Sequence, residues 1–478
     1  MLIGLGYPDR MERLLRIRFA AMLGAALTLL APAARAAAPD NTEALIRRAF
    51  VYSFPLREMG RLWLGDALRM GLPQFNHRRE LRSAADRNVT TPNNDTLYST
   101  AWLNLARGPV KLTVPDTQER YYSVAMLDTA TDNFAIVGRR TTGTRAGEFV
   151  IVGPGWIGSL PEGARVIRAP ANDVLLLLRL VVDGPADLAQ AHRLQDGFRL
   201  TPLQRDAVAA GPAKPPSTAA AGAAPAPAPR AAALQAAAQM SAGERYVTIV
   251  NRMLARNPPP SYERLLLEQF AAVGICGAAC SWDALPPELQ ARWNTLLPVM
   301  LADLERHSHE HEQRVNGWSH PPASVGDFGT QYELRAETAL TGLLALEPAE
   351  ALYLTARQDG ANRPLEGTHT YRLHVPPGSI PVNGFWSLTM YEQDMDGHLY
   401  FVGNSIGRYA IGDRTRGLRR NRDGSIDIWI QRADPGRVRA SNWLPAPPGP
   451  FVLVMRAYEP RVQLRDGRFA MPPVDRME

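Results

Sequence analysis

The sequence predicts an α+β protein, mainly β, with two antiparallel β-sandwich- or barrel-like domains and helices at the N-terminus and between them. Residues 96–182 and 371–456 break into short segments rich in β-branched and aromatic residues, separated by Gly, Pro and Asp turns, as is typical of antiparallel sheets. Residues 243–315 instead carry apolar residues at helical spacing. With 478 residues and 45% hydrophobic content, the chain is long enough for two or three packed cores.

Changes in composition divide the chain into five expected segments. The stretch at 211–239 is dominated by Ala and Pro, which indicates a semi-rigid linker or a long surface loop. The expected segments are a signal peptide at 1–36, an N-terminal helix plus first β domain at 37–210, an Ala/Pro-rich linker at 211–240, a helical region at 241–365 and a second β domain at 366–478.

The first 36 residues contain, in order, the basic segment, the apolar segment and the cleavage site of a secretory signal peptide. Four Arg precede an apolar run from Phe19 to Leu30, and Ala34-Arg35-Ala36 gives an Ala-x-Ala cleavage pattern. The alternative is an amphipathic helix of the mature fold. We expect a periplasmic or secreted protein with no transmembrane segment after signal cleavage, because no later stretch is apolar for long enough to span a bilayer.

The net charge of +6 overstates the basicity of the mature chain. Residues 1–36 carry five Arg, one Asp and one Glu, so their removal lowers the net charge to +3. The basic residues show no Arg stripe interleaved with aromatics, and we expect no nucleic-acid partner. A homo-oligomer is compatible with the sequence.

The two cysteines, Cys276 and Cys280, stand close together among Gly and Ala residues. In an oxidising compartment such a pair predicts a small local disulfide. Two Cys are too few for a structural zinc site, which needs four ligands.

The first half should begin with a helix over 41–70, capped by Asn41 or Thr42 and either continuous or broken at Pro55. The run 174–182 is almost continuously apolar, which predicts a central strand buried on both faces. The strands expected here are 96–105, 110–114, 121–127, 134–138, 148–152, 164–168 and 174–182, followed by a helix at 187–198.

The second half should be helical first and then β-rich. The expected helices are 243–256, 261–273, 286–315 and 332–343, with one more beginning near Pro348. The expected strands are 371–375, 384–391, 426–431 and 451–456.

The helix expected at 286–315 ends in a histidine cluster. Its His307, Glu310 and His311 match the H-x-x-E-H pattern of one metalloprotease class, which also needs an acidic ligand from a distant helix. Glu333 or Glu337 could be nominated for it, but no pattern singles either out, and the alternative is the polar, solvated end of a long helix. We therefore expect neither a metal site nor a cofactor.

Residues 88–102 form the stretch around which the candidate site is organised. Asn94 and Asp95 follow Pro92, which should push Thr91 into an extended conformation. A strand bearing Tyr98 and Trp102 comes next, so a loop poor in charge and rich in hydrogen-bonding groups lies beside aromatic rings. These features suit a pocket wall. The alternative is a polar turn whose side chains satisfy local backbone groups.

Similar polar-aromatic clusters recur downstream. We expect Asp95 or Asp128 to act as a base with Tyr98 or the partner carboxylate as acid, provided that their environments separate their pKa values. Arg408 or Arg414 would hold an anionic group by the bidentate fork of its guanidinium. The predicted catalytic residues are Asp95, Asp128 and Tyr98. The predicted substrate-binding residues are Asn94, Trp102, Tyr122, Trp386, Tyr391, Arg408, Arg414 and Trp443.

Two sets of motifs resemble a pair of linked families. Pro92–Tyr98, Arg120–Tyr122 and Gly153–Trp156 resemble the domain-of-unknown-function family DUF1254. The motifs that resemble the companion family DUF1214 are Phe385–Thr389, Arg408-Tyr409, Asn442-Trp443 and Pro447–Phe451. The resemblance covers nearly all of the chain beyond the signal. It implies two β-sandwich-like domains with helices between and around them, and no established reaction.

Three functional hypotheses follow. The first is an exported acid/base hydrolase or lyase that acts on a small or glycan-like substrate. The second is a non-catalytic periplasmic binding protein that holds a small molecule or saccharide with the same pocket walls. The third is an envelope scaffold in which the aromatic clusters are all core, since large aromatics dominate core energetics. Convergence of Asp95, Trp386 and Arg408 on one cavity would favour the first two.

Overall fold

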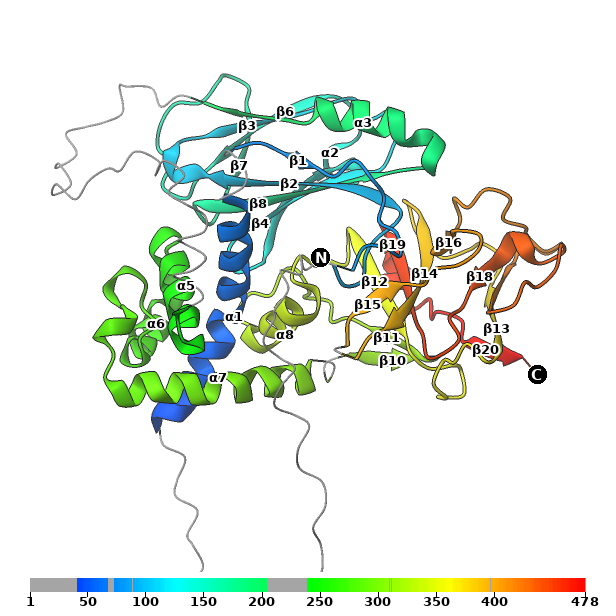
Figure 1. Ribbon diagram of the computed structural model, residues 1–478. Coiled ribbons are helices and arrows are strands. Elements are labelled where there is room, and N and C mark those ends of the chain that lie inside the picture. The colour runs from blue at the N-terminus through cyan, green and yellow to red at the C-terminus, as the bar shows by residue number, and fades with distance from the viewer. Residues whose placement is uncertain are drawn as a thin grey trace, which may run out of the picture.

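A computed structural model of the chain describes residues 41–67, 73–87, 89–203, 239–308, 310, 312–395 and 397–477. A first β unit, a helical layer and a second β unit meet around a central junction (Figure 1). This architecture confirms the α+β class. The expected signal peptide and residues 211–238 of the expected linker lie outside the described residues.

The helical layer is built on α1 (Asn41–Ala67), which continues through Pro55 as one helix of 27 residues. A buried ring stack fixes it to its neighbours, because Tyr246 lies between Phe50 and Trp293, with ring centroids 5.6 and 5.5 Å apart. The layer also contains α5 (Ala242–Arg256), α6 (Arg264–Phe270), α7 (Pro287–His307) and α8 (Tyr332–Gly342). Among these described helices, none has both the length and the apolar character needed to cross a bilayer.

The first β unit has two sheets that share one core. The larger has the order β1 (Asn76–His77), β2 (Thr96–Asn104), β8 (Asp173–Val181), β4 (Tyr122–Leu127) and β5 (Asn133–Gly138). The smaller has the order β7 (Arg165–Arg168), β6 (Gly147–Val152), β3 (Val110–Val114) and β9 (Arg199–Pro202). Strand β8 is central and buried throughout, as its apolar run predicts, and α2 (Arg139–Thr142) and α3 (Leu188–Gly197) complete the unit.

The second β unit also has two sheets around one core. The first has the order β10 (Gln313–Val315), β11 (Trp318–His320), β12 (Ala351–Ala356), β19 (Val452–Tyr458), β14 (Trp386–Gln393) and β15 (Leu399–Phe401), with β16 (Ala410–Gly412) on β14. The second has the order β18 (Trp443–Pro445), β17 (Ile426–Gln431), β13 (Thr370–Val375) and β20 (Val474–Met477). The pairs β6–β7 and β17–β18 are parallel, so these sheets are mixed, and no described sheet closes into a barrel.

Two expectations for the middle of the chain are wrong. The helix expected to run to residue 315 ends at His307, and a hairpin follows in which Val315 pairs with Trp318. Its turn is Asn316-Gly317, and both residues have positive φ, as a tight two-residue hairpin requires. The helix expected near Pro348 is replaced by β12, because pairing with β19 outweighs the local helical preference. Three strands therefore join the second unit from the segment expected to be helical.

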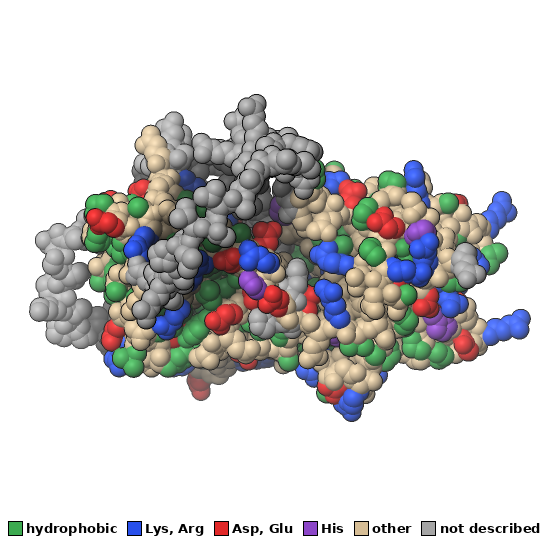
Figure 2. Space-filling model, turned by 90° about the horizontal axis from the view of Figure 1, so that it is seen from below, with side chains coloured by type: hydrophobic (Ala, Val, Ile, Leu, Met, Phe, Trp, Pro, Cys, Tyr) green, Lys and Arg blue, Asp and Glu red, His purple; other side chains and the backbone are tan. Residues whose placement is uncertain are grey.

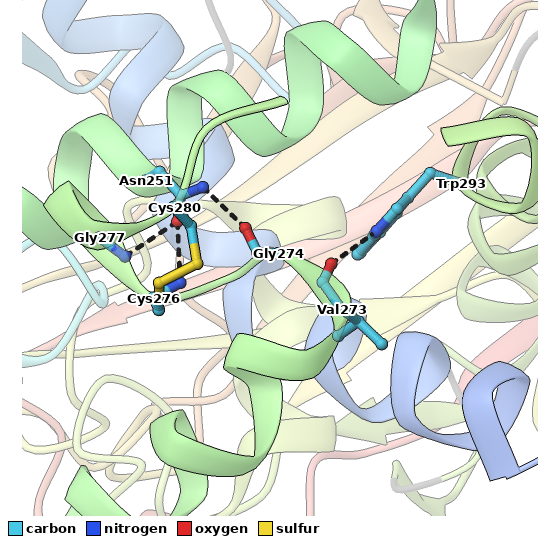
Figure 3. Close-up of a disulfide and its surroundings, with 7 residues drawn as sticks. All are labelled: Asn251, Val273, Gly274, Cys276, Gly277, Cys280 and Trp293. Carbon is cyan, nitrogen blue, oxygen red and sulfur yellow. Dashed lines mark hydrogen bonds between the residues drawn. A yellow bond between two sulfur atoms is a disulfide. The ribbon is translucent and has the colours of Figure 1, made fainter. Parts of the chain in front are cut away.

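The predicted disulfide between Cys276 and Cys280 is present (Figure 3). The side-chain oxygen of Asn251 on α5 accepts hydrogen bonds from the backbone N–H groups of Cys276 and Gly277, at 3.0 and 2.9 Å. Its Nδ2 donates to the carbonyl of Gly274 at 2.8 Å. The disulfide loop is thus held against α5 by one buried amide.

The surface charge is mixed rather than segregated on the face shown in Figure 2, where acidic and basic side chains are interspersed over the second β unit.

Candidate functional site

The stretch around Asp95 lies at the junction between the two β units. Asn93 Nδ2 donates to the hydroxyl of Tyr98 at 3.1 Å and to the hydroxyl of Tyr458 on β19 at 2.6 Å. Asp95 Oδ2 accepts a hydrogen bond from Ser387 Oγ on β14 at 2.5 Å. Polar groups from both halves of the chain therefore meet here.

The backbone of this stretch departs from its expected conformation. Thr91 has a φ of 50°, so the expectation of an extended residue before Pro92 is wrong. A β-branched residue at positive φ is strained by about 1–3 kcal/mol and persists only where its surroundings hold it. Two contacts do so, because Thr91 N donates to the carbonyl of Leu399 at 2.8 Å and Arg456 Nη2 donates to the Thr91 carbonyl at 3.2 Å.

A buried arginine joins the strands behind Asp95. Arg456 on β19 is 2% exposed. Its Nη1 donates to Thr389 Oγ1 at 2.8 Å, and its Nη2 donates to the Tyr391 hydroxyl at 2.6 Å. The Tyr391 hydroxyl donates in turn to the Pro92 carbonyl at 2.5 Å. Tyr391 is one of the predicted site residues, whereas Arg456 belongs to a polar-aromatic cluster noted in the sequence but was not given a role.

The other predicted aromatic residues lie in hydrophobic cores. Trp102, Tyr122, Trp386 and Trp443 are all buried, and each donates a hydrogen bond to a structural partner. The acceptors are Asp66 Oδ2 at 3.2 Å, the Gly143 carbonyl at 3.0 Å, Ser379 Oγ at 2.9 Å and the Gln431 carbonyl at 2.8 Å. Packing in a hydrophobic core accounts for the presence of each of these rings, so no ligand is needed to explain them.

The predicted arginines also bind other groups of the protein. Arg408 Nη1 donates to the Trp443 carbonyl at 2.7 Å and to two neighbouring carbonyls. The guanidinium of Arg414 donates twice to Asp183 Oδ1, at 2.8 and 2.6 Å. Asn94 Nδ2 donates to the Arg82 carbonyl at 2.5 Å. The structure therefore does not bring Arg408 and the Trp386 ring to Asp95 in a shared pocket.

Asp128 takes part in a different contact, between the β4–β5 turn and α8. Its Oδ1 accepts hydrogen bonds from the N–H groups of Ala130 and Asp132, at 2.9 and 3.0 Å. Asp132 accepts a hydrogen bond from Arg335 Nη2 on α8 at 2.8 Å. Burial, with the charge of Asp132 adding to it, raises the pKa of Asp128 to about 7. A carboxyl with this pKa can exchange protons near neutral pH.

The histidine cluster lies at the exposed end of α7. His307 Nδ1 bonds the Asp303 carbonyl at 2.7 Å, and His307 Nε2 lies 3.8 Å from Glu310 Oε1. His311 lies outside the described residues.

An open groove at the junction is formed by two hollows of about 410 and about 540 Å³. The two hollows share Arg140, Asn383 and Glu459. Six arginines line this groove, which we call the arginine groove: Arg139, Arg140, Arg145, Arg165, Arg461 and Arg465. None of the site residues predicted from the sequence lines it.

Glu459 is a buried carboxyl in the wall of the groove. Its Oε2 accepts a hydrogen bond from Arg139 Nη1 at 2.5 Å, whereas its Oε1 is enclosed and has no hydrogen-bond partner among the described residues. Burial raises the pKa of Glu459, and the nearby Glu350 carboxylate adds to this rise against the opposing charge of Arg139. The residue also has a φ of 49°, a strained conformation of the kind found at functional sites.

The groove is connected to the Asn93 stretch through buried side chains. Arg140 Nε donates to Glu350 Oε2 at 2.7 Å, and Glu350 Oε1 accepts from the Tyr121 hydroxyl at 2.8 Å. The Tyr121 ring meets that of Tyr458 edge to face, with 5.2 Å between centroids. Tyr458 in turn bonds Asn93, so one chain of contacts crosses the junction.

Family comparisons divide the chain at this junction. Residues 72–202 match the family described as "Protein of unknown function (DUF1254)", and residues 350–462 match "Protein of unknown function (DUF1214)". The chain thus carries a DUF1254 domain followed by a DUF1214 domain. Arg139, Arg140 and Arg145 belong to the DUF1254 domain, and Asn383 and Glu459 belong to the DUF1214 domain. The arginine groove is therefore built by both.

A solved structure shows the same fold. The crystal structure of the VPA0106 protein from Vibrio parahaemolyticus is similar with a TM-score of 0.66 and 22% identity, over 91% of this chain and 100% of that one. A protein from Burkholderia cenocepacia matches with a TM-score of 0.42 and 13% identity, over 92% of this chain and 93% of that one, which is too low to carry an argument. No curated protein matches the chain significantly. At 22% identity the likeness to the VPA0106 protein is one of fold.

Proposed function

We propose that this protein binds a small anionic ligand in the arginine groove between its DUF1254 and DUF1214 domains. The observation that carries the proposal is the lining of the groove, where six arginines face only two acidic residues, Glu119 and Glu459. The arginines come from both domains, so a ligand would contact both at once.

Several arginines of the groove have no carboxylate partner among the described residues and can therefore bind a ligand. Arg145 and Arg465 form no ion pair with any described residue. Arg165 lies over the Phe149 ring, 5.2 Å from its centroid, without a carboxylate partner. Guanidinium groups bind carboxylate, sulfate and phosphate through paired donors. Each hollow also has a volume in the range typical of small-molecule sites, about 300–1,000 Å³.

Calorimetric titration with glucuronate, sulfate and neutral glucose tests this proposal. We expect the full chain to bind the two anions and not glucose, and the Arg145→Gln and Arg465→Gln variants to bind them about tenfold more weakly. Arg437→Gln is the matched control, because Arg437 is exposed and does not line the groove. Equal affinities for glucose and glucuronate, or equal losses in the control, would contradict the proposal.

A second candidate is acid/base catalysis on the bound ligand, a hydrolase or lyase reaction in which Glu459 transfers the proton. It is supported by the place of Glu459 in the lining of both hollows and by the raised pKa of this carboxyl. The roles expected for Asp95, Asp128 and Tyr98 have weaker support, because none of them lines the groove. Turnover of a glycoside or ester of glucuronate that is abolished in Glu459→Gln, with binding retained, would favour the enzyme. Binding without turnover in the unaltered chain would favour a non-catalytic binding protein.

We also propose export to the periplasm or the outside of the cell. The Cys276–Cys280 disulfide supports it, because such bonds persist in oxidising compartments. Cell fractionation of the full chain and of a chain beginning at residue 37 tests it. Recovery of both in the cytoplasm would contradict export.

A further inference from the structure

The arginines in the middle of the arginine groove are already paired. Arg140, Asn383 and Glu459 line both hollows, so they form the wall that the two hollows share. Arg140 Nε donates to Glu350 Oε2 at 2.7 Å, and Arg139, beside this wall, donates to Glu459 Oε2 at 2.5 Å. Carboxylates of the protein thus offset both of these guanidinium groups, and neither needs a ligand to do so.

Unpaired arginines lie on either side of the shared wall. Arg461 and Arg465 line only the smaller hollow, and neither forms an ion pair with a described residue. Arg145 and Arg165 line only the larger hollow and have no carboxylate partner among the described residues. Glu119 also lines the larger hollow and offsets one of its two arginines. A net positive charge therefore remains at both ends of the groove.

The groove is large for a ligand with a single acidic group. Its hollows have volumes of about 410 and about 540 Å³, and each is within the range of about 300–1,000 Å³ that holds a whole small molecule. A sulfate ion or a lone carboxylate held in one hollow would leave the arginines of the other hollow without a partner. A ligand with two separated acidic groups matches the charge at both ends.

The shared wall favours hydroxyl groups in the middle of such a ligand. Asn383 Oδ1 accepts a hydrogen bond from Arg461 Nε at 3.0 Å, whereas Asn383 Nδ2 donates to no described residue and can bind a hydroxyl oxygen. The Arg140 side chain is 29% exposed in the same wall. An alkyl chain there would displace water from this guanidinium without replacing its hydrogen bonds, which is unfavourable.

We propose that the ligand of the arginine groove is a hydroxylated dicarboxylate, a sugar diacid, with one carboxylate held in each hollow. The inference rests on the proposed function, because it names the chemical class of the anion bound there. The unpaired Arg145 and Arg165 belong to the DUF1254 domain, and Arg461 belongs to the DUF1214 domain. The ligand therefore connects the two domains, and joining both contacts in one molecule increases its affinity.

Calorimetric titration of the full chain with glucarate, gluconate, adipate and sulfate tests this class. Glucarate carries two carboxylates on a hydroxylated chain. Gluconate keeps that chain but has one carboxylate, adipate has both carboxylates without hydroxyls, and sulfate has two charges in one compact group. We expect one glucarate to bind per chain, at least about tenfold more tightly than each of the other three anions.

Variants at the two ends distinguish a ligand that spans the groove from one attracted by charge alone. Arg145→Gln and Arg465→Gln each remove a partner of one carboxylate, so each should lower the affinity for glucarate about tenfold. Arg437→Gln is the control and should leave this affinity unchanged, because Arg437 lines neither hollow.

Three results would overturn the sugar diacid while leaving the anion site of the proposed function in place. These are gluconate or sulfate binding as tightly as glucarate, adipate binding as tightly as glucarate, and a loss of glucarate affinity in only one of the two end variants. Binding of none of the four anions would overturn the proposed function as well.

Discussion

Asn93 Nδ2 lies 2.6 Å from the hydroxyl oxygen of Tyr458, and this hydrogen bond joins residues 365 positions apart in the chain. The same amide bonds Tyr98, and Asn93 Oδ1 accepts from the Asp95 N–H at 2.7 Å. One buried amide therefore fixes both the turn before β2 and its docking on β19. The junction that carries the arginine groove depends on such contacts.

The Asn93→Ala variant should lower the free energy of unfolding by about 2–3 kcal/mol, because it leaves buried hydroxyl and N–H groups without partners. Urea denaturation of both proteins measures the difference. Asn76→Ala is the control, since Asn76 is exposed and should change stability by less than about 0.5 kcal/mol. A loss for Asn93→Ala no larger than that of the control would show that the amide is not important to the junction.

Arg256→Met should destabilise the contact between the helical layer and the first β unit. Asp173 is fully buried and accepts two hydrogen bonds at 2.6 Å from Arg256. Removal of the guanidinium leaves the buried Asp173 carboxylate without its positively charged partner. The free energy of unfolding, measured by urea denaturation, should fall by about 3 kcal/mol. Lys111→Met breaks the surface pair with Glu148 and should cost less than about 1 kcal/mol. Equal losses for the two variants would contradict this ranking.

Asp128→Asn should change how stability depends on pH. The pKa of Asp128 is about 7 in the folded chain and ordinarily 3.8, so the folded state holds its proton more tightly than the unfolded state does. This tighter proton binding by Asp128 stabilises the folded state. Its contribution is fully present below pH 3.8 and is lost as the pH rises to about 7. The Asn side chain mimics the protonated form, so the stability of the variant relative to wild type should rise by about 4 kcal/mol between pH 4 and pH 8.

Urea denaturation of wild type and Asp128→Asn across this pH range provides the measurement. Asp283→Asn, at an exposed position, is the control and should track wild type at every pH. A constant difference between wild type and Asp128→Asn across the range would refute the raised pKa.

Glu459→Gln should remove a pH dependence of anion binding. Because the pKa of Glu459 is raised above its ordinary 4.5, its negative charge is lost as the pH falls through the raised value, and sulfate should then bind the wild-type groove more tightly. The Gln variant also frees Arg139 from its partner. At pH 8 it should bind sulfate about tenfold more tightly than wild type, with a flatter pH profile in calorimetry. Parallel profiles would show that Glu459 does not face the ligand.

Much of the strand pattern could be predicted from the sequence. The strands at 110–114 and 426–431 were predicted to the residue, and the central position of β8 follows from its apolar run. Such signals are local, because side-chain alternation and composition act within a few residues. The hairpin at Asn316-Gly317 was missed although its turn signal is present in the sequence, since the helical pattern before it was extended too far.

The candidate site was predicted only in part. Asp95, Tyr98 and Tyr391 do reach the junction, but Trp386 and Trp443 are core residues because their rings are buried by sheets that pair strands distant in sequence. No local pattern marks Glu459 as a groove residue.

The sequence by itself determined most of the strands and helices, that the two cysteines pair, and which families the two halves resemble, because each depends on neighbouring residues or short motifs. Only the tertiary structure decided which side chains share a site. Arg139 and Glu459 are 320 positions apart, and they meet because the two β units dock on one another. That docking depends on many long-range contacts at once, and no one segment encodes it.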